Sequence, residues 1–268
     1  MDKVFYKILI LYYLILPFCG VSQSYYLVKT INTKVDYLRI DIFGSLYLVN
    51  DNKLSRYDSI GNFIDEFSSN KFGQITSVDL SNPMRLLLFS KTNNQIIYLD
   101  NKLTQIGDAI DLSQFGIYNA GLVCNSMMGG LWLFDETENK LLRVDQNMNL
   151  IFKIDLRTST GNNSTPIYFT EYQRKLYVLN QNYELFEIDN FGNQTFLMQL
   201  PEIKYFEVDN TQINYYFEFD FYKKSIDGKL IDKINIQLNG QINDVQIFEN
   251  RLYILKNSCL FIHYNSSH

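Results

Sequence analysis

The chain has 268 residues, a formal net charge of −5, and a composition that is 46% hydrophobic and 20% charged. This balance is typical of a globular protein and excludes an intrinsically disordered chain. The acidic surplus argues against nucleic acid as a partner, because phosphates require a basic surface. The 20 Tyr and 20 Phe residues favour β-strands, and the length allows one or two domains.

The chain begins with a segment that is typical of a cleaved signal peptide, residues 1–22. Lys3 and Lys7 form its basic region, and the apolar run at 8–18 is shorter than the roughly 20 residues that span a bilayer. Small residues just before Gln23 suit cleavage there. We therefore expect export to the periplasm or the cell surface. No other stretch is apolar for long enough to span a membrane.

After this segment, the chain consists of a single predicted strand at 25–33 and six similar units of about 40 residues. Each unit contains short strands, and a few polar residues separate its second and third strands, which is typical of a hairpin. In chain order the units cover residues 36–68, 76–113, 121–156, 167–200, 205–238 and 244–265. The first five units have four strands each, and the sixth has three.

Four antiparallel strands repeated at a period of about 40 residues are typical of β-propeller blades. The strand at 25–33 would supply the missing strand of the last blade and so join the two ends of the chain. This closure hides strand edges that would otherwise promote aggregation. The sequence therefore predicts an all-β fold, a six-bladed β-propeller closed by the N-terminal strand completing the last blade, in a single domain over 23–268.

The third strand of each unit ends with a carboxylate or its amide. These residues are Asp58, Asp100, Asp145, Asp189, Asp227 and Asn265. An Asp or Asn at the start of a turn accepts hydrogen bonds from backbone N–H groups. We interpret them as turn residues that repeat with the fold rather than as metal ligands, because they would lie on outer turns far from one another.

The sequence contains no recognisable catalytic set. Its two histidines are His263, in a predicted third strand, and the terminal His268, so neither a nucleophile–histidine relay nor a histidine metal site can be built. Cys124 and Cys259 fall in opposed blades, beyond the ~7 Å that a disulfide allows, and we expect two buried free thiols. Cys19 lies in the predicted signal peptide. Its use as a lipoprotein anchor is the alternative, but the bulky Phe18 before it stands where such signals have a small residue. We expect no catalytic residues and no cofactor.

The first strand of each unit would line the central channel. These strands carry seven charged residues, Arg39, Asp41, Asp79, Glu171, Glu207, Asp209 and Asp244. We take Arg39, Asp41, Asp79, Glu171 and Asp209 as the candidate channel residues. A ring of carboxylates could hold Ca²⁺, which takes oxygen ligands, or could simply be a solvated lining. The metal alternative resembles six-bladed lactonase-type hydrolases in architecture only. It predicts a bound metal that is lost on replacing Asp79 or Glu171.

The connections between blades are predicted to lie on one face and to provide an interface. They carry the aromatic residues Phe72, Phe115 and Tyr118, and Asn162 lies in the longest polar connection. Aromatic residues on polar loops are favoured at interfaces, although they also tuck under their own loops. Trp132 is expected in the core. A glycan-binding propeller that uses Trp132 or the loop aromatics is a further alternative.

Residues 73–155 resemble a family of exported β-propellers of the Bacteroidetes cell envelope, mainly through 75–79, 82–83 and 131–136. The likeness covers about a third of the chain. The family includes the periplasmic plug of the type 9 secretion translocon. It implies a non-catalytic protein–protein interaction module whose partner is another envelope protein, an outer-membrane component. A periplasmic plug or an accessory subunit of an outer-membrane secretion translocon is the finer expectation.

Overall fold

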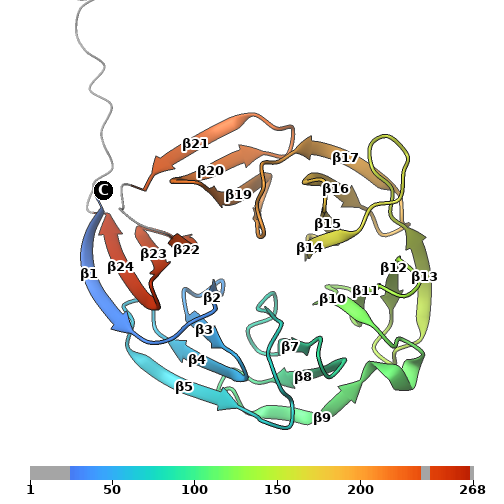
Figure 1. Ribbon diagram of the computed structural model, residues 1–268, viewed down its shortest axis with the longest axis horizontal. Helices are drawn as coiled ribbons and strands as arrows, with labels where there is room; N and C mark the ends of the chain where they lie inside the picture. Colours follow the sequence, from blue (N-terminus) through green and yellow to red (C-terminus); the bar gives the residue numbers. More distant parts are fainter. Residues whose placement is uncertain (1–24, 237–241, 266–268) are drawn as a thin grey trace, which may run out of the picture.

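The computed structural model describes residues 25–236 and 242–265, and the expected signal peptide lies outside them. Within the described residues the strands form six antiparallel four-stranded sheets arranged as blades around a central axis (Figure 1). This arrangement confirms the predicted six-bladed β-propeller. No helix in the same residues is both long and apolar enough to cross a membrane.

Each blade runs from an inner strand at the axis to an outer strand at the rim of the ring. Blade 1 contains β2 (Tyr37–Ile40), β3 (Leu46–Asn50), β4 (Lys53–Tyr57) and β5 (Phe63–Ser68). Blade 2 contains β6 (Ser77–Asp79), β7 (Leu86–Ser90), β8 (Gln95–Leu99) and β9 (Gln105–Asp111), which the short 3-10 helix η1 (Leu112–Phe115) follows. Blade 3 contains β10 (Ala120–Asn125), β11 (Leu131–Asp135), β12 (Lys140–Val144) and β13 (Leu150–Asp155).

The second half of the ring repeats this order. Blade 4 contains β14 (Pro166–Tyr172), β15 (Lys175–Asn180), β16 (Glu184–Ile188) and β17 (Gln194–Gln199). Blade 5 contains β18 (Glu207–Asp209), β19 (Gln212–Phe217), β20 (Asp220–Ser225) and β21 (Leu230–Asn235). Blade 6 contains β22 (Ile242–Phe248), β23 (Arg251–Lys256) and β24 (Cys259–Asn265), with β1 (Tyr25–Asn32) as its outer strand.

The second strands are apolar throughout because both of their faces are buried. In β7, Leu86 and Leu88 pack against blade 1, whereas Leu87 and Phe89 pack against blade 3. Successive side chains of a strand point to opposite faces, so burial on both faces requires an unbroken apolar run. One such core fills each of the six junctions between neighbouring blades. Each fully buried Leu or Phe contributes about 1.5–3 kcal/mol to folding.

The Asp residues that follow the third strands of blades 1 to 4 organise the turns, as predicted. In blade 5 the third strand ends at Ser225, so the predicted Asp227 lies within the turn and not at its start. Asp100 Oδ1 accepts hydrogen bonds of 2.8 Å from the backbone N–H groups of Lys102 and Thr104. The same pair of bonds, to the second and fourth residues after the Asp, recurs at Asp58, Asp145 and Asp189. These carboxylates therefore stabilise separate turns and do not converge on one site.

The ring closes through the N-terminal strand. β1 pairs antiparallel with β24 from Tyr25, opposite Asn265, to Asn32, opposite Cys259, with one irregularity between Leu27 and Lys29. The first strand and the last three therefore form one blade, which confirms the predicted closure (Figure 1).

The antiparallel order of the strands gives the ring two different faces. The turns between first and second strands, and between third and fourth strands, lie on one face, which we call the turn face. The connections between second and third strands, and from one blade to the next, lie on the opposite face, which we call the linker face. The sequence-based candidates Phe72, Phe115, Tyr118 and Asn162 all belong to the linker face.

Candidate functional site

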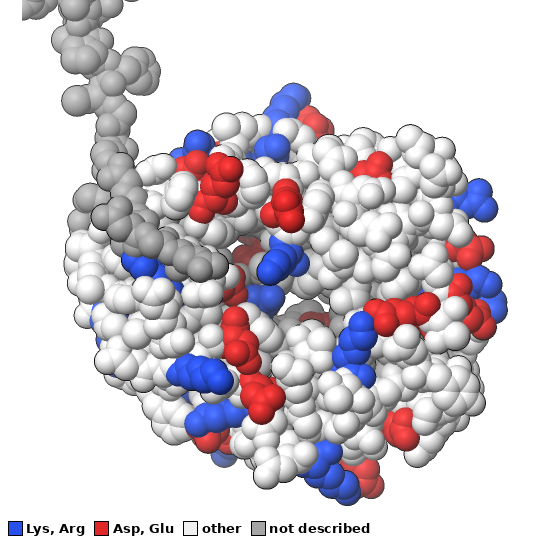
Figure 2. All heavy atoms as spheres, viewed as in Figure 1, with Lys and Arg blue, Asp and Glu red and all other residues white. Residues whose placement is uncertain are grey.

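A cavity of about 820 Å³ lies at the centre of the ring, lined by residues of the inner strands of all six blades. Figure 2 shows a central hollow with acidic and basic side chains at its border. Among the lining residues are all five channel candidates from the sequence, namely Arg39, Asp41, Asp79, Glu171 and Asp209. The volume falls within the 300–1,000 Å³ that is usual for ligand pockets.

Two of these carboxylates join neighbouring blades. Asp79 Oδ2 accepts a hydrogen bond of 2.6 Å from Asn125 N, which joins blades 2 and 3. Glu171 Oε2 accepts a bond of 2.7 Å from Trp132 Nε1, and its Oε1 accepts one of 3.2 Å from Met127 N. Both bonds of Glu171 join blades 3 and 4. Hydrogen bonds to charged groups are about twice as strong as neutral ones, so these contacts stabilise the junctions.

The other two carboxylates lie at turns. Asp41 Oδ1 accepts bonds of 2.9 Å from Phe43 N and from Ser45 N, which shape the first turn of blade 1. Asp209 is exposed at the end of β18, and its Oδ1 accepts a bond of 3.0 Å from Asn210 Nδ2. Asp209 thus keeps most of its acceptor capacity for solvent or a ligand.

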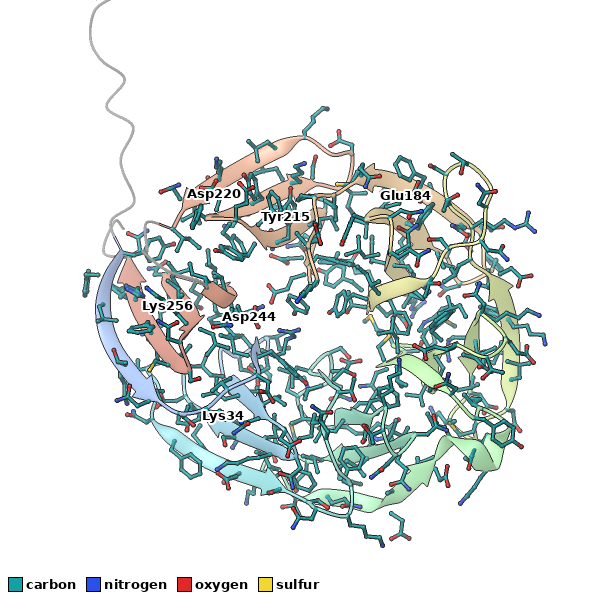
Figure 3. The ribbon with its side chains drawn as sticks, in the orientation of Figure 1. Lys34, Glu184, Tyr215, Asp220, Asp244 and Lys256 are labelled. Atoms are coloured by element: carbon teal, nitrogen blue, oxygen red, sulfur yellow. The ribbon has the colours of Figure 1, made fainter. Side chains whose placement is uncertain are left out.

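Arg39 occupies the junction between the last blade and the first. Its Nη1 lies 3.1 Å from Asp244 Oδ2, and both side chains are more than four-fifths buried. The guanidinium carbon lies 3.6 Å from the centre of the Tyr205 ring, a cation–π contact with blade 5. Figure 3 shows Asp244 at the inner end of its blade, facing the centre of the ring. Burial raises the pKa of Asp244, while the charge of Arg39 opposes that rise.

Tyr205 connects this ion pair to Glu207. The Tyr205 hydroxyl donates a hydrogen bond of 3.2 Å to Glu207 Oε1, and its ring lies 4.9 Å from the ring of Tyr168. Burial raises the pKa of Glu207 to about 7, although Arg39 lowers it. Neither tyrosine was a sequence-based candidate, because they come from two different blades that only the packing of blade 4 against blade 5 brings together.

The described carboxylates do not assemble a metal centre. In residues 25–236 and 242–265, no group of three His, Cys, Asp or Glu side chains is arranged to hold a metal ion. Asp79 and Glu171, on which the lactonase-type alternative depends, accept hydrogen bonds from the adjacent blade instead. The geometry therefore does not favour that alternative.

A cluster of exposed apolar side chains borders the cavity on the turn face. Its members are Ile42, Phe43, Met84, Met127 and Met128, which are 59–71% exposed. They come from the turns between the first and second strands of blades 1, 2 and 3. We call this set the apolar rim. None of its residues was a sequence-based candidate, although apolar residues beside Gly or Pro in a predicted turn were a signal that could have indicated the rim.

The equivalent turns of blades 4, 5 and 6 are polar. They carry Gln173 and Arg174, then Asn210 and Thr211, then Glu249 and Asn250. Asp209 and Glu249 belong to this half of the border and also line the cavity. The opening of the cavity on the turn face is therefore apolar on one half and polar, with exposed carboxylates, on the other.

On the linker face the structure corrects one candidate. Phe72 is only 3% exposed, because it packs in the core between blades 1 and 2. The prediction that it is available for binding is wrong, and burial of its apolar ring is the physical reason. Phe115, Tyr118 and Asn162 are exposed. Their role as interface residues stays a prediction.

Trp132, Cys124 and Cys259 pack within the blades and do not form a binding site. Trp132 is 2% exposed and donates to Glu171, so it cannot stack on a sugar ring, and the glycan alternative is wrong for this residue. Cys124 is a buried free thiol, as expected. Cys259 is also free but half-buried, because it lies at the start of β24 beside the outer strand.

No protein-family model and no curated protein matches this chain. Solved structures match it in fold. Virginiamycin B lyase from Staphylococcus aureus is 12% identical, with 91% of this chain and 90% of that one covered and a TM-score of 0.58. BBS1N in complex with ARL6DN is 11% identical, with 92% and 98% covered and a TM-score of 0.56. A protein of unknown function from Bacteroides caccae is 7% identical, with 76% and 82% covered and a TM-score of 0.54.

These identities establish the fold alone, so the chain is a six-bladed β-propeller whose activity must be argued from its own residues. A histidine-to-alanine variant of the staphylococcal lyase is catalytically inactive. The one histidine in the described part of this chain is His263, which lies in β24 opposite Leu27 and Leu252 and is not among the residues that line the cavity. The likeness therefore does not carry lyase chemistry to this cavity.

Proposed function

We propose that this chain is a non-catalytic interaction module that binds another protein through its turn face. The observation that carries the proposal is the apolar rim, in which five large apolar side chains from three neighbouring turns are each more than half exposed. Exposed apolar clusters are typical of interaction surfaces, and Met and Phe are enriched in them. The polar turns of the other three blades would form the border of such an interface.

We propose further that the chain is exported and that its partner is an outer-membrane component of the cell envelope. The signal-like composition of residues 1–22 supports export. The resemblance of 73–155 to envelope propellers supports the class of partner. A periplasmic plug or an accessory subunit of a secretion translocon is the role that fits both.

Pull-down from detergent-solubilised envelopes tests the proposal. The tagged chain should retain one outer-membrane protein, identified by mass spectrometry. A rim variant that combines Phe43→Glu with Met128→Glu should lose it, whereas Phe219→Glu, between β19 and β20 on the linker face, should keep it. Both variants should melt within a few degrees of the wild-type chain, because all three side chains are exposed. Failure of the wild type to retain any protein, or equal recovery by the rim variant, would contradict the proposal.

A further inference from the structure

We infer that the partner presents a short segment in which a Lys or Arg lies beside apolar residues, and that this basic side chain enters the central cavity from the turn face. The inference rests on the proposed function, since it names the chemistry of the partner at the same surface. Two features of the surface support it, the continuity of the apolar rim with the cavity and the distribution of charge along the cavity walls.

The apolar rim and the cavity form one continuous surface. Ile42 and Met127 belong to the rim and are 68% and 64% exposed, and both also line the cavity. A segment that covers the rim with apolar side chains therefore lies at the opening of the cavity. A residue of the segment next to these apolar side chains can then project into the cavity.

The cavity carries an excess of negative charge. Its acidic lining residues are Asp41, Asp79, Glu171, Glu207, Asp209 and Glu249, and its basic ones are Arg39 and Lys223. Arg39 is already paired with Asp244, an acidic residue outside that set, so six carboxyl groups face one uncompensated cation. Carboxylates gathered along a cavity with protein walls concentrate their field and attract cations.

The carboxylates nearest the opening are the ones open to a ligand. Asp209 and Glu249 are exposed, and neither takes part in an ion pair within the described residues. Both lie on the polar half of the cavity opening, across from the apolar rim, and both line the same cavity. A segment lying over the opening would thus place apolar side chains on one half and a cation toward the other.

The same charges disfavour an acidic segment. Among the described residues, Lys223 is the one lining cation without an ion pair, and Arg174, in the first turn of blade 4, is not a lining residue. An acidic side chain in the cavity would face several carboxylates for each cation. Like charges across an interface lower affinity and exclude such partners.

Two pools of blocked heptapeptides provide the test, each randomised among Leu, Ile, Phe, Met and Val except for the central residue, which is Arg in one pool and Glu in the other. Competition against a fluorescent member of the Arg pool measures binding to the tagged chain. The Arg pool should bind at least about tenfold more tightly than the Glu pool, and the preference should shrink as salt is raised. The combined variant Asp209→Asn, Glu249→Gln should reduce that preference.

A matched control and the pull-down separate the outcomes. Glu138→Gln replaces an exposed carboxylate on the linker face and should leave the preference unchanged. Equal binding of the two pools, or no binding of either, overturns the inference. If the outer-membrane protein is still retained in a rim-dependent manner, the proposed function survives that result. If it is not retained, both proposals fail.

Discussion

Within the described residues, Glu207 differs from Asp79 and Glu171 in accepting no hydrogen bond from an adjacent blade. Its one side-chain partner is the hydroxyl of Tyr205, which precedes β18 in the same blade, and Asp209 and Asp244 are nearby negative charges. Burial therefore raises its pKa to about 7, although Arg39 lowers it. A carboxyl with a raised pKa in the folded state stabilises folding at low pH and loses this contribution as the pH rises.

Replacing Glu207 with Gln should remove the loss of folding stability that the Glu207 carboxyl causes as the pH rises. In the wild type, Glu207 contributes fully to the free energy of unfolding below its ordinary pKa of 4.5. This contribution disappears as the pH rises through its folded-state pKa of about 7. Glu207→Gln, which can still accept the Tyr205 bond, should match the wild type at pH 4 and be about 2–3 kcal/mol more stable at pH 8. Urea unfolding of both proteins across this range measures the difference. A constant difference at all pH values would show that the side chain is not buried as described.

At the scale of elements, the first turn of blade 3 supports part of the apolar rim. It carries Met127 and Met128 and ends at Gly130, which has a φ of +78°. A Cβ at Gly130 would lie 2.1 Å from the carbonyl oxygen of Val144, on the third strand of the same blade. Glycine at this position therefore allows the turn to pass close to the backbone of β12.

Gly130→Ala should consequently lower the free energy of unfolding far more than the same substitution at a glycine with open space around it. Gly161, in the connection between blades 3 and 4, has a φ of +86° but open space where a Cβ would lie. Gly161→Ala should lower the free energy of unfolding by about 1 kcal/mol from backbone strain alone. Gly130→Ala adds overpacking and should lower it by about 3 kcal/mol. Denaturant unfolding of the two variants compares them, and equal losses would refute the close contact with Val144.

At the scale of the whole molecule, the ring depends on the pairing of its two ends. Cys259 begins the last strand and lies directly opposite Asn32 at the end of β1, 227 residues away in the chain. Opposed residues of antiparallel strands have Cα atoms about 4.5–5.5 Å apart, a distance that a disulfide spans. A covalent link at this point would therefore fix the closure.

Asn32→Cys should form a disulfide with Cys259 in the chain that begins at residue 23. Because it closes a long loop, it should stabilise the folded ring by about 2–4 kcal/mol under oxidising conditions. Melting with and without reductant measures the gain, and Asn32→Ser is the control that cannot cross-link. Cys124 should stay reduced, since it is buried. Free thiols at both positions after oxidation would contradict the pairing of β1 with β24.

Features that repeat along the chain could be predicted from the sequence because each depends on local chemistry. The apolar run of β7 follows from burial on both faces of one strand, and Asp100 forms its turn bonds within four residues. The spare strand at 25–33 followed from counting strands in the last unit. Each of these features recurs with the same spacing whatever the arrangement of the blades in space.

The tertiary structure alone decided what meets at the centre of the ring. Arg39 and Asp244 are 205 residues apart in the chain and pair only because the last blade meets the first. The apolar rim likewise combines three turns separated by whole blades, and Phe72 is buried because two blades cover it. The physical reason is that a channel built from one strand of each blade depends on the closure of the ring, which no local pattern encodes.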